Sequence, residues 1–110
     1  MSGAMSRRKG AASELEFCRL LHAHGWSHAA RTSDGRAQQG RGDIQRGPAG
    51  IHLELKRRER IEIVRWCQDT ELDAASTDIP VVAFRQSHQP WRMVMLAEDL
   101  LPILKLRETG

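Results

Sequence analysis

Two carboxylates and one ammonium group are predicted to meet on one face of a β-hairpin. In the segment 51–56, alternation of side chains places Glu54 and Lys56 on one face and the aliphatic residues on the other. The preceding segment, 42–46, presents Asp43 on a polar face, so a short hairpin would bring Asp43 beside Glu54. Hard oxygen ligands bind Mg²⁺, and a nearby cation offsets charge that develops when a phosphodiester is cut. The pattern predicts phosphodiester hydrolysis; a surface ion pair without function is the alternative.

A third carboxylate, Glu14, belongs to the segment 11–24, in which apolar residues recur at helical spacing. At about 100° per residue, Glu14 falls among the apolar side chains of that helix, whereas Glu16 lies on the polar side. A carboxylate on an apolar face is costly unless it is paired or binds a metal. The alternatives are that Glu14 reaches water at the edge of the stripe, or pairs with Lys9 or Arg31.

The remaining periodicity predicts the elements that must position these side chains. Residues 1–8 are expected to form a flexible basic lead-in, followed by a single domain at 9–110. The order is helix, three strands, helix, two strands and helix, which predicts an α/β fold with a mixed central β-sheet of about five strands flanked by helices. The runs 80–84 and 91–96 are nearly continuously apolar, as in strands covered on both faces. The predicted helices are 11–24, 61–75 and 97–106, and the predicted strands are 27–31, 42–46, 51–56, 80–84 and 91–96.

Composition favours a globular chain with a basic surface. Of the 110 residues, 40% are hydrophobic and 28% charged, and the net charge is +3. Lysines and arginines cluster at 7–9, 31–41 and 56–60, which is typical of a protein that binds a phosphate backbone. No apolar run is long enough to span a bilayer, so an intracellular, cytoplasmic protein without a membrane partner is expected. Cys18 and Cys67 lack Cys-x-x-Cys spacing and are expected to be reduced core residues.

The ordered set of motifs resembles the archaeal-type Holliday-junction resolvases within the PD-(D/E)XK nuclease superfamily. The resemblance covers nearly the whole chain, from Arg8 to about Leu96. It implies a restriction-endonuclease-like core and a homodimeric, Mg²⁺-dependent endonuclease, with Mn²⁺ as a substitute, that cuts branched DNA in recombination or repair. It also implies a location at the nucleoid, or in the host cytoplasm if the gene is phage-encoded. The motifs are residues 8–14, then Arg31, Thr32 and Ser33, Gly42 and Asp43, Glu54, Leu55 and Lys56, residues 79–81, and Trp91 and Arg92.

The resemblance also implies a role for each site residue. Asp43, Glu54 and the backbone carbonyl of Leu55 would hold the metal, and Glu14 would act through an intervening water. Lys56 would position the attacking water, so the catalytic set is Glu14, Asp43, Glu54 and Lys56. The side chains expected to contact DNA are those of Arg7, Arg8, Lys9, Arg31, Ser33, Arg36, Arg41, Arg57, Arg58 and Arg85.

Two departures from the family bear on the preference for branched DNA rather than on hydrolysis. Leu15 stands where the family often has an arginine, and the loop 32–42 is longer than usual. The alternative functions are a nicking or restriction-like endonuclease acting on duplex DNA, and a non-catalytic DNA-binding module of the same fold. A module that only binds phosphate gains nothing from three carboxylates, which favours the enzyme.

Three other residues have two interpretations each. His52 is expected to be a strand residue near the rim, with a proton shuttle as the alternative. Trp66 and Trp91 are expected to be core or dimer contacts, with stacking on bases as the alternative.

Overall fold

The predicted order of elements is confirmed. The computed structural model describes residues 3–32 and 42–110, and their side chains from residue 10 onward. The helices are α1 (Gly3–Ala23), α2 (Ile63–Asp73) and α3 (Ala97–Thr109), and the strands are β1 (Ala30–Arg31), β2 (Ile44–Gln45), β3 (Ile51–Arg57), β4 (Ile79–Arg85) and β5 (Arg92–Val94).

The α/β class is confirmed, but the single sheet of about five strands is not observed. The described strands form a three-stranded sheet in the order β3-β4-β5 and a separate antiparallel pair, β1-β2. The larger sheet is mixed, because β3 and β4 are parallel whereas β4 and β5 are antiparallel. Gly42 (φ 69°) and Arg46 (φ 57°) flank β2, and these left-handed conformations keep it shorter than the predicted strand 42–46.

The junction between β2 and β3 shows why the two sheets stay separate. The Asp43 backbone N–H donates to the Leu53 carbonyl at 2.8 Å, as in an ordinary ladder. The next donor, the Leu55 N–H, bonds the Asp43 carboxylate at 2.7 Å. A side-chain oxygen therefore occupies the place of a backbone carbonyl, and the ladder does not continue.

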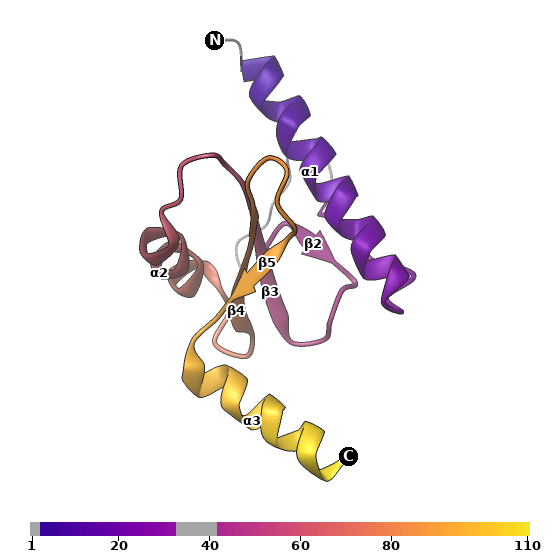
Figure 1. The fold of residues 1–110 in the computed structure, drawn as a ribbon, viewed down its shortest axis with the longest axis vertical. Helices are drawn as coiled ribbons and strands as arrows, with labels where there is room; N and C mark the ends of the chain where they lie inside the picture. The colour runs from indigo at the N-terminus through magenta and orange to yellow at the C-terminus, as the bar shows by residue number, and fades with distance from the viewer. Residues whose placement is uncertain (1–2, 33–41) are drawn as a thin grey trace.

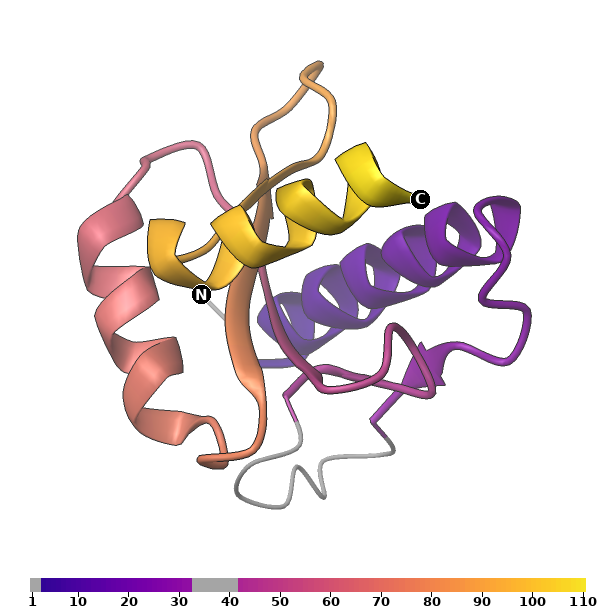
Figure 2. The same cartoon turned by 90° about the horizontal axis from the view of Figure 1, so that it is seen from below.

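Helices cover both faces of the three-stranded sheet (Figures 1 and 2): α1 lies on one side and α2, the connection between β3 and β4, on the other. Phe17 and Leu21 of α1 belong to a buried core with Leu53 of β3. On the opposite side, Trp66 of α2 contacts Phe84, with ring centroids 6.2 Å apart. The predicted covering of both faces is thus confirmed for β4.

Both ends of the fold differ from the predictions. Helix α1 begins at Gly3 rather than near residue 11, and its first turns extend past the sheet (Figure 1), where no apolar stripe is needed. Its end is confirmed, because Gly25 adopts φ 105° directly after the last turn. At the other end, β5 is not covered on both faces, since Met93 is 54% exposed. Helix α3 has no buried residue and projects away from the sheet (Figures 1 and 2).

Gly42→Ala is expected to lower the free energy of unfolding by about 2–3 kcal/mol, measured by denaturant titration. A Cβ atom at Gly42 would lie 2.5 Å from the Leu53 carbonyl oxygen, at a residue whose φ is already +69°. Gly50→Ala is the matched control, because Gly50 has φ +73° but open space at the Cβ position. Its cost should be limited to about 1–2 kcal/mol of left-handed backbone strain. Equal losses in both variants would contradict close packing of Gly42 against β3.

Candidate functional site

Asp43 is held at the edge of β3 by two backbone contacts. Its N–H donates to the Leu53 carbonyl at 2.8 Å, and its carboxylate accepts the Leu55 N–H at 2.7 Å. Because the N–H and C=O of a strand residue point to the same edge, the Leu55 carbonyl faces the edge where Asp43 lies. The structure therefore brings together the predicted aspartate and the predicted backbone ligand.

Glu54 lies beside Asp43, and its acidity is strongly altered. The pKa of Glu54 is raised to about 7, first by burial and then by the negative charge of Asp43. A hydrogen bond with Asp43, which the protonated form of Glu54 can make, raises the pKa further, whereas contact with His52 lowers it. Two carboxylates are thus held close together although their charges repel one another.

Glu14 is paired with a cation, as the alternative interpretation proposed. The Arg31 Nε donates to Glu14 Oε1 at 3.0 Å. Burial raises the pKa of Glu14, the hydrogen bond from Arg31 opposes this effect, and the charge of Asp43 raises the pKa further. Glu14 therefore lies within electrostatic reach of Asp43. It does not join Asp43 and Glu54 in a cluster close enough to share one ion directly.

Lys56 and Glu54 line one open pocket between β3 and α2. The pocket has a volume of about 310 Å³, and its other lining residues are Asp69, Thr70 and Asp73. Within the described side chains, no carboxylate forms an ion pair with Lys56. Its ammonium group is thus available to an anion that enters the pocket.

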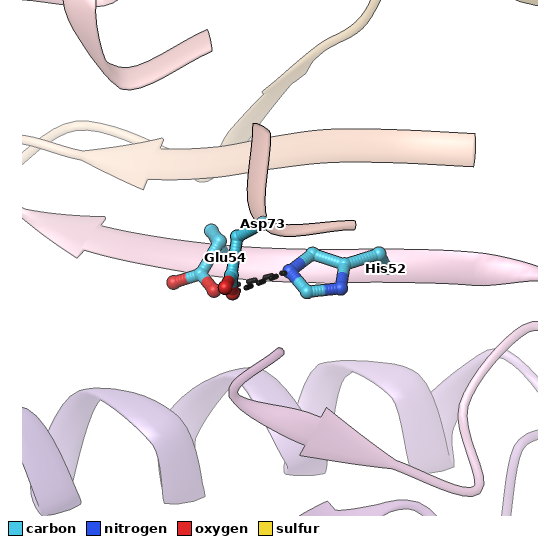
Figure 3. A group of neighbouring side chains, drawn as sticks. All are labelled: His52, Glu54 and Asp73. Carbon is cyan, nitrogen blue, oxygen red and sulfur yellow. Dashed lines mark hydrogen bonds and ion pairs between the residues drawn. The ribbon is translucent and has the colours of Figure 1, made fainter. Parts of the chain in front are cut away.

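His52 and Asp73 join Glu54 on the α2 side of β3 (Figure 3). The His52 Nε2 lies 3.2 Å from Glu54 Oε1 and 3.5 Å from Asp73 Oδ2. His52 is only 1% exposed, so its predicted place near the rim is wrong: α2 covers this face of the strand. Asp73 was not predicted as a site residue. One signal was present, because an acidic residue at the last position of a helix opposes the helix dipole.

The arginines predicted to contact DNA have several different environments. Arg31 pairs with Glu14, and Arg57 lies 3.6 Å from the Glu59 carboxylate. Arg58 is exposed at the end of β3, where its guanidinium donates to the Arg57 carbonyl at 3.1 Å. Other candidates fall outside the description: the side chains of Arg7, Arg8 and Lys9, and the residues Ser33, Arg36 and Arg41.

Glu16 has a structural role that its place on the polar side of α1 did not suggest. It accepts hydrogen bonds from Arg85 and from Trp91 Nε1, the latter at 2.6 Å. Arg85, which was predicted to contact DNA, also donates to the Gln89 carbonyl at 2.7 Å. Its guanidinium group therefore already has hydrogen-bond partners within the chain. Trp91 packs against Phe17 with ring centroids 5.1 Å apart, as expected for a core residue.

Comparisons of the chain with protein-family models, curated proteins and solved structures found no match. The resemblance to resolvases therefore stays a prediction drawn from the motifs. None of the described helices combines the length and apolar character needed to cross a bilayer.

Proposed function

We propose that the chain is a metal-dependent DNA endonuclease of the PD-(D/E)XK type that prefers branched DNA. The observation that carries this proposal is the proximity of Asp43 to Glu54, a carboxylate whose pKa is raised to about 7 by burial and then by the charge of Asp43. Carboxylates held together against their repulsion are characteristic of functional sites, and a divalent cation would relieve the repulsion. Lys56, which follows on the same face of β3, supplies the cation of the motif.

The donor set fits Mg²⁺, with Mn²⁺ as a substitute. Asp43, Glu54 and the Leu55 carbonyl would hold the ion through hard oxygen atoms. When bound, such an ion polarises a phosphodiester and acidifies a coordinated water. Lys56 would stabilise negative charge on the phosphate from the pocket side, and Arg31, held in place by Glu14, would do so from the β1 side.

The exposed apolar surface of α3 supports the proposal of a homodimer. An isolated helix of this length is marginally stable in water, and α3 has no buried residue. Exposed apolar side chains gathered on one helix are typical of an interaction site. The surface consists of five exposed residues: Leu100, Leu101, Ile103, Leu104 and Leu106.

The charges at the ends of α3 favour a second copy of the chain as the partner. Glu98 and Asp99 lie in the first turn and Arg107 in the last turn, where Lys105 forms an ion pair with Glu108. Two copies of α3 packed antiparallel about a twofold axis would place the acidic end of each beside the basic end of the other. Such a dimer presents two nuclease sites, as cleavage of opposing strands at a junction requires.

Leu101→Lys is expected to weaken the dimer by at least about tenfold, because burying one leucine contributes about 1.5–3 kcal/mol. Sedimentation analysis over a range of concentrations measures the change. Leu72→Lys is the control, since Leu72 is 85% exposed on a different helix, α2, and its replacement should leave the dimer intact. A wild-type chain that stays monomeric, or a Leu101→Lys variant that dimerises normally, would contradict the α3 interface.

Cleavage of a synthetic four-way junction tests the function. The wild-type chain with Mg²⁺ should cut the junction faster than linear duplex or single-stranded DNA of matched sequence, and EDTA should stop the reaction. Failure to cut any substrate with Mg²⁺ or Mn²⁺ would favour the non-catalytic DNA-binding module. Equal rates on junction and duplex would favour the nicking or restriction-like endonuclease.

A further inference from the structure

One imidazole and two carboxylates form a compact cluster on the α2 side of β3 (Figure 3). One ligand atom from each of His52, Glu54 and Asp73 lies within 4.8 Å of the others. We infer that these three residues bind a divalent transition-metal ion, represented by Zn²⁺, at a site separate from the oxygen-only site at Asp43. The two sites share Glu54 alone.

The ligand set selects a transition metal over Mg²⁺. Imidazole nitrogen suits Zn²⁺ and its first-row neighbours, whereas Mg²⁺ prefers oxygen ligands and retains its waters. Three protein ligands made of histidine and carboxylates leave a further position open on Zn²⁺. Glu54 and Asp73 line the open pocket between β3 and α2, so an ion could reach them from solvent.

Without a metal ion, one imidazole nitrogen of this cluster faces two carboxylate oxygens. A neutral imidazole carries a single N–H, yet Nε2 faces both Glu54 Oε1 (3.2 Å) and Asp73 Oδ2 (3.5 Å). The other ring nitrogen, Nδ1, has no hydrogen-bond partner among the described residues, and it would carry the ring proton when Nε2 binds the ion. An ion coordinated by Nε2 and both carboxylates would satisfy the three facing atoms at once.

The position of Asp73 is a second, independent observation in favour of a cation. Asp73 is the last residue of α2, where the partial negative charge of the helix end disfavours a carboxylate. Asp69 lines the same pocket, so three carboxylates face its single lysine, Lys56. A divalent ion beside Asp73 would offset both the helix dipole and this excess of negative charge.

Zn²⁺ binding by the full-length chain, measured by competition with a chromogenic chelator in the absence of DNA, tests the inference. Asp73→Asn should weaken the binding of one Zn²⁺ by at least about tenfold. Loss of a residue that only supports a metal ligand already weakens metal binding by about that factor. Asp69→Asn is the matched control, because it removes a charge from the same pocket outside the cluster. Its loss of affinity should be much smaller than that of Asp73→Asn, because it removes only a nearby charge, and Asp43→Asn should still retain the ion.

Replacing the buried His52 would risk unfolding the chain, so the role of this residue is tested by NMR on the wild-type chain. Zn²⁺ should shift the imidazole NMR signals of His52, and Mg²⁺ in large excess should not reverse the shift. Unchanged affinity in Asp73→Asn, or equal losses in Asp73→Asn and Asp69→Asn, would overturn the inference. So would loss of the Zn²⁺ in Asp43→Asn, which would place the ion at the oxygen-only site. Because DNA cleavage is not measured, failure of the proposed nuclease activity would leave these outcomes unchanged.

Discussion

Asp43→Asn is expected to lower the rate of junction cleavage at least about a thousandfold, which corresponds to about 4 kcal/mol of transition-state stabilisation. The substitution removes a charge that would hold the divalent ion. An amide oxygen can still accept the Leu55 N–H, a contact of 2.7 Å in the wild-type chain, so the link between β2 and β3 should survive. Single-turnover cleavage with saturating enzyme and Mg²⁺ measures the loss, and thermal unfolding verifies the fold.

Two controls separate this chemical role from a structural one. Asp69→Asn makes the same carboxylate-to-amide change on α2 and should keep the wild-type rate. Asp43→Asn and the wild type should bind the junction alike in EDTA, because phosphate contacts by basic side chains supply that affinity. Wild-type cleavage by Asp43→Asn would remove this carboxylate from the proposed mechanism.

The free energy of unfolding in EDTA is expected to fall by about 1–3 kcal/mol as pH rises from about 5 to 8, owing to Glu54. The pKa of Glu54 is about 7 in the folded chain and 4.5 ordinarily. Below the ordinary value both states bind the proton, and the group has no effect on stability. Between the two values only the folded state keeps the proton, so stability decreases as pH rises. Above pH 7 Glu54 is ionised in both the folded and the unfolded state, and the loss of stability is complete.

Glu54→Gln should remove this pH dependence, because the amide carries no charge beside Asp43. At pH 8 in EDTA the variant should be more stable than the wild type, although it should not cleave DNA. Glu98→Gln, at an exposed position in the first turn of α3, should leave the pH dependence unchanged. Mn²⁺ should stabilise the wild type more than Glu54→Gln, since a ligand stabilises the state that binds it. Equal slopes of stability against pH in the wild type and Glu54→Gln would contradict the assignment.

Local periodicity in the sequence was sufficient to predict the order of helices and strands and the end of α1 shortly before Gly25. It also predicted that Glu54 and Lys56 share a face of β3, because alternation along a strand depends on the backbone of that strand alone. The apolar face of α1 correctly drew attention to Glu14, whose side chain needs a partner. These features depend on residues a few positions apart, which is why a single sequence predicts them.

Tertiary structure decided how those elements meet. The burial of His52 and its contact with Asp73 exist because α2 packs across β3, and neither segment alone indicates this arrangement. Where the two sheets divide, the Leu55 N–H donates to the Asp43 carboxylate instead of to a backbone carbonyl. Glu16 acquires its role only when β4 and β5 bring Arg85 and Trp91 beside α1. Contacts between segments distant in sequence leave no periodic signal, so three-dimensional packing alone determined them.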